Sequence, residues 1–246
     1  MSKSLVWVSG ASSGIGRAMV DKVPWEGARV IGISRRPGPA PAEHLRADLS
    51  DPASWQAVGE SFAAELDGFD GERVVFVHAA GTVDPIGFAG RVDSEAYSAG
   101  VVLNSAAPQV LGHMFLAAAR PLEGRQPRPG RHLVMITSGA AKGVYAGWSS
   151  YGAGKAAMDQ WVRNAGAEQA LGGGVQVLAV APGTVDTAMQ ARLRETPEGD
   201  FPARAKFVGI HESGGLSDPH EVATRIWGLL DGDLPSGSVL DLRDRP

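Results

Sequence analysis

Short apolar runs rich in β-branched residues alternate along the chain with longer segments in which apolar residues recur at helical spacing. The short runs predict strands at residues 5–9, 28–34, 45–49, 73–78, 132–137, 175–180 and 238–242. The longer segments predict helices at residues 15–23, 54–66, 94–120, 149–171 and 219–230. The run 73–78 is nearly continuous in apolar residues, as in a strand buried on both faces of a parallel sheet. The pattern therefore predicts an α/β fold built on one doubly wound parallel sheet.

One stretch interrupts this alternation. Residues 188–216 are polar and rich in Gly and Pro, with a few large apolar residues scattered among them. We expect this stretch to be a mobile loop that covers a substrate. Because the chain shows no repeat and no linker long enough to separate two domains, residues 1–246 are expected to form a single domain.

A glycine-rich turn follows the first predicted strand. It joins strand 5–9 to helix 15–23 with the spacing G-x-x-x-G-x-G. Glycines let the backbone approach a ligand closely, and a helix N-terminus behind them favours an anion. Strand, turn and helix in this order predict a Rossmann-type site for the pyrophosphate of a dinucleotide, whereas a plain strand-to-helix turn would also use glycine. The residues assigned to it are Gly10, Ser12, Ser13, Gly14, Ile15 and Gly16.

Two arginines, Arg35 and Arg36, stand at the end of the second predicted strand. A dinucleotide fold that uses NAD commonly places an acidic residue there to bind the ribose hydroxyls. A guanidinium at that place suits a 2′-phosphate, so the predicted cofactor is NADP or NADPH. The alternative is that the two arginines are merely solvated.

Tyr151 and Lys155 stand four residues apart in the predicted helix 149–171, which puts them on one face, one turn apart. Ser149 and Ser150 are its candidate N-cap residues. Bringing the pKa of a phenol from about 10 to about 7 takes roughly 4 kcal/mol. One ammonium at about 4 Å, with an effective dielectric constant near 20, contributes about that much. The pair is therefore a candidate proton donor and acceptor, and an ordinary helix face is the alternative.

Two further residues have suggestive places. Ser138 directly follows strand 132–137, and open parallel sheets bind ligands outside the carboxyl ends of their strands. In the predicted helix 94–120, Pro108 cannot donate the hydrogen bond that the carbonyl of Asn104 would accept. We expect a kink there and a carbonyl open to a water or a lysine, although a harmless kink is equally consistent with the sequence.

Composition excludes several classes of function. The net charge of -4 gives no electrostatic footprint for nucleic acid or an anionic membrane. The absence of cysteine removes disulfides and thiolate chemistry, and the six histidines show no metal-ligand spacing, so no metal is expected. No signal peptide is expected, nor any stretch long enough to span a membrane, which favours a cytoplasmic protein.

Taken together in this order, the motifs resemble those of the short-chain dehydrogenase/reductase family over essentially the whole chain. The residues that carry the resemblance are Gly10, Gly14, Gly16, Asn104, Ser138, Tyr151, Lys155 and the turn 182–187. Within the family, the stretches AGTVDPIG, KGVYAGWSSYGAGKA, APGTVDTAMQ and SGSVLDL are most similar to the sepiapterin reductase and benzil reductase branch. The resemblance implies a fold that binds NADPH and catalyses the reduction of a carbonyl group.

The resemblance also implies roles for individual residues. Tyr151 would donate a proton to the carbonyl oxygen, and Ser138 would hydrogen-bond that oxygen. Lys155 would lower the pKa of the tyrosine and hold the nicotinamide ribose, and the carbonyl of Asn104 would hold a water that passes protons to Lys155. Further cofactor contacts fall on Asp48, Leu49, Ala80, Gly81, Pro182, Gly183, Val185 and Thr187.

The sequence departs from the family pattern at the ends of two strands. Ser9 replaces the usual threonine and keeps its hydroxyl. His78 and Ala79 replace two asparagines, so the usual hydrogen bonds of that loop are in doubt. His78 would either replace part of them or be a packed core histidine.

These features predict an NADPH-dependent carbonyl reductase with a small-molecule substrate, a compact α-dicarbonyl such as a benzil-like diketone or a pterin side-chain diketone. The expected cavity walls are Val144, Tyr145, Trp148 and Met189, which are large and apolar or aromatic. By resemblance Asp241 would anchor a pterin, or it only ends the last strand. The alternatives are an enzyme for another ketone or alcohol, such as a 3-oxoacyl thioester or a steroid, and a non-catalytic NADP-binding sensor. Small residues on helices 94–120 and 149–171, which pair across the subunit interface in the family, predict a homodimer.

Overall fold

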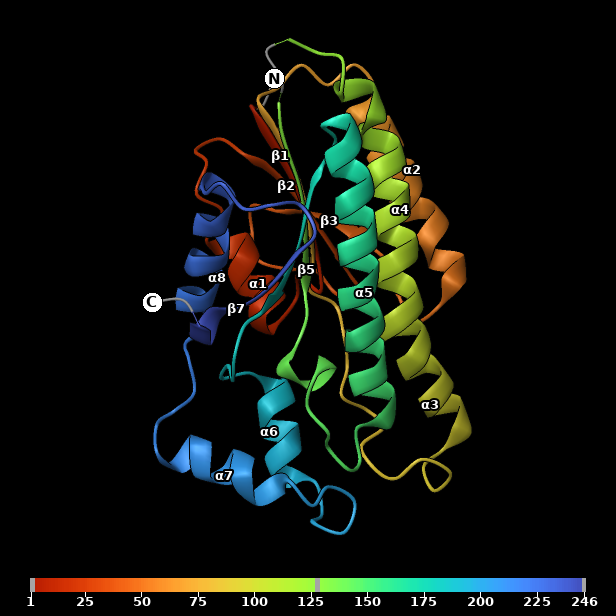
Figure 1. Ribbon diagram of the computed structural model, residues 1–246, viewed down its shortest axis with the longest axis vertical. Helices are drawn as coiled ribbons and strands as arrows, with labels where there is room; N and C mark the ends of the chain where they lie inside the picture. The colour runs from red at the N-terminus through yellow and green to blue at the C-terminus, as the bar shows by residue number, and fades with distance from the viewer. Residues whose placement is uncertain (1–2, 127–128, 245–246) are drawn as a thin grey trace.

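A computed structural model describes residues 3–126 and 129–244 of the chain (Figure 1). Within these residues, seven strands form one sheet in the order β3-β2-β1-β4-β5-β6-β7, and all neighbouring strands are parallel. The strands are β1 (Ser4–Ser9), β2 (Arg29–Ser34), β3 (Glu43–Arg46), β4 (Arg73–His78), β5 (Gly130–Ile136), β6 (Gln176–Ala181) and β7 (Ser238–Asp241). This confirms the predicted α/β fold. The strand order reverses between β1 and β4, which is where open sheets of this kind bind ligands.

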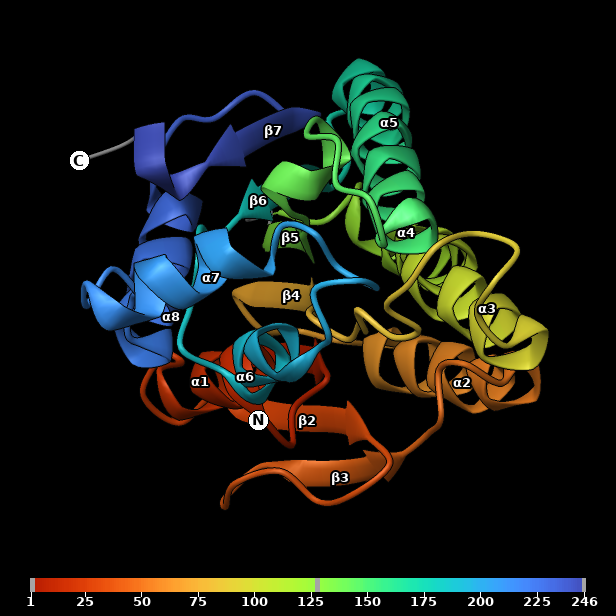
Figure 2. The same ribbon diagram turned by 90° about the horizontal axis from the view of Figure 1, so that it is seen from below.

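Helices cover both faces of the sheet (Figures 1 and 2). One face carries α1 (Gly14–Asp21) and α8 (Pro219–Gly228). The other carries α2 (Trp55–Leu66), α4 (Ala107–Ala119) and α5 (Ser149–Gly172). Three further helices, α3 (Ser94–Val101), α6 (Ala188–Glu195) and α7 (Arg204–Glu212), lie toward the end of the molecule at which the strands terminate.

The two faces enclose separate apolar cores because side chains alternate along each strand. On β4, Phe76 belongs to the core beneath α2 and α4, whereas Val77 belongs to the core beneath α1 and α8. The first core is built around Trp7, Phe62, Phe76 and Phe115, whose contacting rings have centroids 4.9 to 6.1 Å apart. Burial on both sides accounts for the nearly continuous apolar run that identifies β4 in the sequence.

The edge strand β3 lies earlier in the chain than predicted. Its pairing with β2 runs from Glu43 opposite Ile31 to Arg46 opposite Ser34, and it stops where β2 itself ends. The prediction of a strand over 45–49 is therefore wrong for residues 47–49. These residues leave the sheet at its carboxyl end, where they line a cavity.

The long helix predicted at 94–120 is interrupted, as expected. A π-helical turn over Val102–Ala106 separates α3 from α4, and Pro108 stands in the first turn of α4. Such wider turns accommodate a missing backbone donor of the kind that proline creates. Asn104 lies in the middle of this turn and is completely buried.

The helix α5 begins and ends close to the predicted positions. Gly173 closes it in the left-handed conformation, with φ of 62°. The prediction that Ser149 or Ser150 caps its N-terminus is wrong, because the cap position is Trp148 and no side chain makes a capping hydrogen bond.

The cover stretch 188–216 is not the loop that its composition predicted. It contains α6 and α7, and the side chain of Thr187 accepts a hydrogen bond from the backbone of Gln190 to cap α6. The sequence analysis missed these two helices because each is only about two turns long and shows too little apolar periodicity to stand out among the Gly and Pro residues.

One helical stretch, Ser94–Leu122, is long and apolar enough to cross a membrane by length and composition, with a mean hydropathy of 1.3 over its most apolar window. This corrects the expectation that no stretch reaches that length. The test is a weak one, since core helices of soluble proteins also pass it. In this stretch, Leu111 and Phe115 are completely buried against the sheet and α2.

Candidate active site

Two adjoining cavities lie at the carboxyl ends of the strands. The glycine-loop cavity, of about 450 Å³, is lined by the turn after β1 and by the segments that follow β2, β3 and β4. The tyrosine cavity, of about 250 Å³, is lined by the loops after β5 and β6, by α5 and by both cover helices. Residues that line both are Ile15, Ala79, Gly81, Val83, Thr187 and Met189. The two cavities are therefore contiguous, so one ligand can extend from the first into the second.

The turn after β1 excludes side chains at two of its glycines. Gly10 has φ of 71°, and a Cβ there would lie 3.0 Å from the backbone of Ala80. A Cβ on Gly16 would lie 2.3 Å from the carbonyl oxygen of Gly10. The turn thus presents bare backbone at the N-terminus of α1, which fits the pyrophosphate of a dinucleotide. All six residues predicted for this loop line the cavity: Gly10, Ser12, Ser13, Gly14, Ile15 and Gly16.

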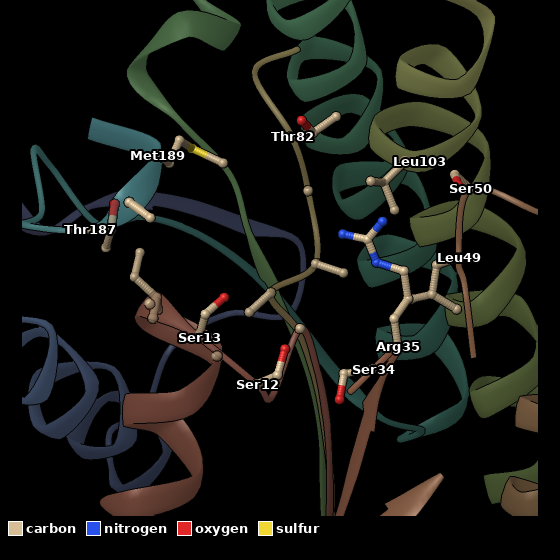
Figure 3. A pocket seen from close by; sticks show the side chains of 18 of the residues that line it. Ser12, Ser13, Ser34, Arg35, Leu49, Ser50, Thr82, Leu103, Thr187 and Met189 are labelled. Atoms are coloured by element: carbon tan, nitrogen blue, oxygen red, sulfur yellow. The ribbon is translucent and has the colours of Figure 1, made fainter. Parts of the chain in front are cut away.

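A guanidinium reaches into the glycine-loop cavity from the end of β2. Figure 3 shows the side chain of Arg35 extending from Ser34 toward Leu103. Asp48 lines the same cavity, but its carboxylate accepts hydrogen bonds from the backbone and hydroxyl of Ser50, at 3.1 and 2.6 Å. Those bonds hold the pKa of Asp48 below its usual range. Arg36, the second arginine predicted to bind the cofactor, is exposed and lines neither cavity.

The loop after β4 is held by a hydroxyl instead of asparagine amides. The Oγ of Ser9 accepts hydrogen bonds from the backbone N–H groups of Ala79 and Ala80, each at 3.1 Å. Because both lone pairs of this oxygen are used, the Ser9 hydroxyl donates its proton to Nδ1 of His78, 3.1 Å away. A neutral His78 that accepts at Nδ1 carries its proton on Nε2. Burial, with a smaller contribution from the charge of Lys155, lowers the pKa of His78 to about 3. His78 is thus a packed core histidine that also replaces part of the usual loop bonding.

Ser138, Tyr151 and Lys155 all line the tyrosine cavity, as their places in the sequence predicted. Ser138 follows β5 and accepts a hydrogen bond from the backbone of Ala140 at 3.1 Å, which fixes its orientation. Tyr151 and Lys155 come from the first two turns of α5 and are 7% and 4% exposed. The ammonium of Lys155 lies 5.8 Å from the centroid of the tyrosine ring.

Burial dominates the electrostatics of this group. It raises the pKa of Tyr151, and a hydrogen bond with Ser138 opposes the rise. It lowers the pKa of Lys155 to about 8, against the opposing charge of Asp159. The ammonium donates a hydrogen bond to the carbonyl oxygen of Ile136 at 2.8 Å. Without a bound ligand, Tyr151 is therefore a protonated phenol. The sequence predicted that Lys155 would lower the pKa of Tyr151, but the pKa is raised, because burial is the larger effect.

Asn104 connects the π-helical turn to the loop after β4. Its side-chain oxygen accepts from the backbone N–H of Thr82 at 3.0 Å, and its amide nitrogen donates to the carbonyl of Thr82 at 2.8 Å. Its own carbonyl oxygen faces α5, because a Cβ on Gly154 would lie 3.2 Å from it. Asn104 therefore abuts the helix next to Lys155 without lining either cavity.

The predicted substrate walls are partly correct. Tyr145, Trp148 and Met189 line the tyrosine cavity, together with Pro182, Gly183, Val185 and Thr187 from the loop after β6. Val144 is fully exposed and lines neither cavity, which corrects its assignment. Asp241 also lies outside both linings, and its carboxylate accepts hydrogen bonds from Arg243 at 2.9 and 2.5 Å. The place expected for a pterin anchor is thus taken by an ion pair.

Several lining residues escaped the sequence analysis. From the cover helices come Gln190, Leu193, Lys206, Phe207 and Ile210, and from the segment after β7 comes Arg243. Within each helix the spacing is helical: Leu193 follows Gln190 by three residues, and Ile210 follows Lys206 and Phe207 by four and three. The glycines and prolines between the two helices obscured this signal. No local signal marks Arg243, since only the closing of the sheet by β7 brings it to the cavity.

The structure combines a parallel sheet, a glycine turn at its switch point, and a serine, a tyrosine and a lysine beside that turn. This combination defines a class of nicotinamide-dependent oxidoreductases. Residues 4–198 match the model of the short chain dehydrogenase family, and the chain belongs to that family. It therefore acts on the CH–OH/C=O couple with a nicotinamide cofactor. The bare glycine turn and the two contiguous cavities fit such a cofactor.

The relatives confirm the predicted branch. The chain is 30% identical over 241 residues to the (S)-benzoin-forming benzil reductase of Bacillus subtilis, covering 96% of this chain and 97% of that protein. It is 36% identical over 137 residues to sepiapterin reductase of Mus musculus, covering 54% and 51%. A solved short chain dehydrogenase/reductase of Saccharomyces cerevisiae shares the fold, with a TM-score of 0.81, 24% identity and coverage of 98% and 97%.

Proposed function

We propose that the protein is an NADPH-dependent carbonyl reductase that acts on α-dicarbonyl compounds. One observation carries this proposal: Ser138, Tyr151 and Lys155 line a single cavity that opens into the glycine-loop cavity. A non-catalytic NADP-binding sensor would need the glycine turn and Arg35 but not these three side chains together. The combination therefore favours an enzyme.

The chain's own residues supply the proton and stabilise the charge. Hydride for the carbonyl carbon comes from the reduced nicotinamide when the cofactor is bound. Tyr151 donates the proton to the carbonyl oxygen, and burial keeps its phenol protonated until then. Ser138 hydrogen-bonds the oxygen on which charge develops. Lys155, with a pKa of about 8, is largely cationic at neutral pH and stabilises the phenolate that the transfer leaves.

Reprotonation of the site passes through Lys155 in this proposal. Lys155 would return a proton to the Tyr151 phenolate, and a water held by the carbonyl of Asn104 would reprotonate the lysine amine that this leaves. The contact of that carbonyl with α5 at Gly154, one residue before Lys155, supports this role. The double hydrogen bond of the Asn104 side chain to Thr82 fixes its backbone in place.

The preference for NADPH rests on Arg35. Its guanidinium reaches into the glycine-loop cavity (Figure 3), where it suits a 2′-phosphate. Asp48, the acidic residue in the same lining, has its carboxylate occupied by Ser50. It is therefore a poor partner for ribose hydroxyls, which would otherwise favour NADH.

The substrate class follows from the size and walls of the tyrosine cavity. About 250 Å³ lined by Tyr145, Trp148 and Phe207 suits a compact aromatic or planar dicarbonyl better than a steroid or an extended acyl thioester. The similarity to a benzil reductase supports a hydrophobic diketone. The ion pair of Asp241 removes the carboxylate that a pterin would require.

We also propose a cytoplasmic homodimer. The helices α4 and α5 carry small residues outside the subunit core, which allow close approach of a second copy: Ala117 and Ala118 on α4, and Gly152, Ala153, Ala156 and Ala157 on α5. Light scattering at micromolar concentration tests this, and a monomer would refute it.

The reductase activity is tested by NADPH consumption with benzil, sepiapterin, a quinone, a steroid ketone and acetoacetyl coenzyme A. We expect benzil to be reduced with the highest kcat/KM, and NADPH to be preferred over NADH. A higher kcat/KM on the thioester or the steroid would overturn the substrate class. Tight NADPH binding without turnover of any carbonyl compound would favour the sensor.

A further inference from the structure

Three polar side chains line the tyrosine cavity without a role in the proton transfer. Tyr145 comes from the loop after Ser138, Lys206 from α7, and Arg243 from the 3-10 turn after β7. The ammonium of Lys206 donates a hydrogen bond to the hydroxyl of Tyr145 at 2.9 Å and lies 5.1 Å from its ring centroid. Arg243 is close enough for Tyr145 to contribute to its raised pKa, after the larger effect of Asp241. We call Lys206 and Arg243 the cationic rim.

The guanidinium of Arg243 is held in one orientation. Its Nε and Nη2 donate to the two oxygens of Asp241 at 2.9 and 2.5 Å, and the Asp241 carboxylate also accepts from the backbone of Arg243 at 3.0 Å. A Cβ on Gly139 would lie 3.3 Å from Nη2, and one on Gly183 would lie 3.4 Å from the aliphatic stem. Arg243 therefore spans the loops after β5 and β6, and its Nη2 lies beside the residue that follows Ser138.

The charges around the cavity do not balance. Lys206 and Arg243 line it, and Lys155 lies deeper, whereas none of the lining residues that the structure describes is acidic. Outside the lining, Asp241 pairs with Arg243 and Asp159 acts on Lys155, which leaves Lys206 without an acidic partner among the described residues. A neutral diketone has no use for such an excess, and two exposed cations at one entrance repel each other. An anionic group of the ligand would satisfy both.

We propose that the physiological substrate is an anionic ketone, in which a carboxylate lies at the end remote from the reacting carbonyl and binds Arg243 and Lys206. This inference rests on the proposed reductase function and narrows its substrate class. Asp241 occupies the Nε and Nη2 edge of the guanidinium, so Nη1 and the second N–H of Nη2 form the edge that matches the substrate carboxylate. The ammonium of Lys206 adds a further donor. The aromatic walls hold the body of the substrate, so the recognised molecule is a compact aromatic ketone acid.

The test compares benzil, para-carboxybenzil and the methyl ester of para-carboxybenzil as substrates with saturating NADPH. The ester matches the acid in shape but carries no charge. Because both rim cations are exposed, we expect the acid to have a KM about tenfold lower than the ester, with kcat unchanged. Arg243→Gln should abolish this preference and Lys206→Gln should reduce it, each measured as the ratio of the ester KM to the acid KM within the same variant. Lys22, which is exposed and lines neither cavity, gives the control Lys22→Gln, which should retain the full preference.

Equal KM values for acid and ester in the parent, or a preference that survives both rim variants, would overturn the inference and leave the reductase function standing. Failure to reduce any of the three diketones would instead count against the proposed function. In that case, binding of para-carboxybenzil and of its methyl ester tests the cationic rim, through the melting temperature of the protein with NADPH present. The acid should raise the melting temperature of the parent more than the ester does, and this difference should be absent in Arg243→Gln. Equal shifts would overturn the inference by this independent measure.

Discussion

Replacing Lys155 by methionine should stabilise the unliganded protein while removing its chemistry. Lys155 is 4% exposed, and its ammonium donates one hydrogen bond, to the carbonyl of Ile136. Burial lowers its pKa from 10.5 to about 8. Since the folded pKa lies below the unfolded value, the charged ammonium destabilises the fold at neutral pH. Between about pH 8 and pH 10.5, Lys155 loses its proton in the folded protein but keeps it in the unfolded chain. The cost of burying the charge therefore decreases as the pH rises through this range.

The magnitude follows from the same two pKa values. Their difference, 10.5 minus 8, is about 2.5 pH units and corresponds to about 3 kcal/mol at pH 7. Loss of the hydrogen bond to Ile136 costs about 1 kcal/mol. Lys155→Met should therefore raise the free energy of unfolding by about 2 kcal/mol at pH 7, falling to near zero by about pH 9.5, where the penalty is roughly halved.

Urea denaturation, followed by tryptophan fluorescence at both pH values and at one fixed protein concentration, measures this. The matched control is Lys22→Met, which replaces an exposed lysine and should leave the free energy of unfolding within about 0.5 kcal/mol of the parent at either pH. A Lys155→Met variant less stable than the parent at pH 7, or a gain that persists at the higher pH, would refute the reasoning. Such a result would mean that the ammonium has stabilising contacts that outweigh its desolvation.

Three further changes test other parts of the site. Arg35→Asp should shift the relative affinity from NADPH toward NADH by about 1.5–3 kcal/mol in fluorescence titrations, and a parent that prefers NADH would contradict it. Gly16→Ala places a Cβ 2.3 Å from the carbonyl oxygen of Gly10 and should abolish NADPH binding. The control Gly172→Ala, whose Cβ meets no atom within 4 Å, should leave binding intact. NADPH binding retained in Gly16→Ala would contradict the proposed turn. Gln190 is 3% exposed, and neither atom of its amide has a partner among the described residues, so Gln190→Leu should raise the free energy of unfolding by about 1–2 kcal/mol. A lower melting temperature would show that the amide is satisfied.

Where the sequence predicted well, the determining interactions are local. The strands near the centre of the sheet are buried on both faces, so their β-branched runs identify them, as at β4. The glycine turn and the pair Tyr151 and Lys155 are defined by spacings within one turn or one helix. The interruption at Asn104 follows from a single missing donor at Pro108. Each of these features can be deduced without knowing which distant segments come together.

Where the sequence failed, distant segments decide the outcome. Val144 and Tyr145 are neighbours in one loop, but only Tyr145 turns toward the cavity, where it meets Lys206 from α7. Arg243 reaches the tyrosine cavity only because β7 pairs with β6, at the far edge of the sheet. The edge strand β3 lacks a partner on one side, so its limits follow β2 rather than its own apolar pattern.

The central claim is that Tyr151 is the proton donor of an NADPH-dependent carbonyl reductase. The most direct measurement is the steady-state rate of NADPH oxidation with benzil for the parent and for Tyr151→Phe, together with the NADPH dissociation constant of each. The phenylalanine keeps the buried ring and removes only the hydroxyl that pairs with Ser138. We expect kcat to fall by about 10²-fold or more while NADPH affinity stays within about threefold of the parent. Turnover within about fivefold of the parent would contradict the account, because another group would then have to supply the proton.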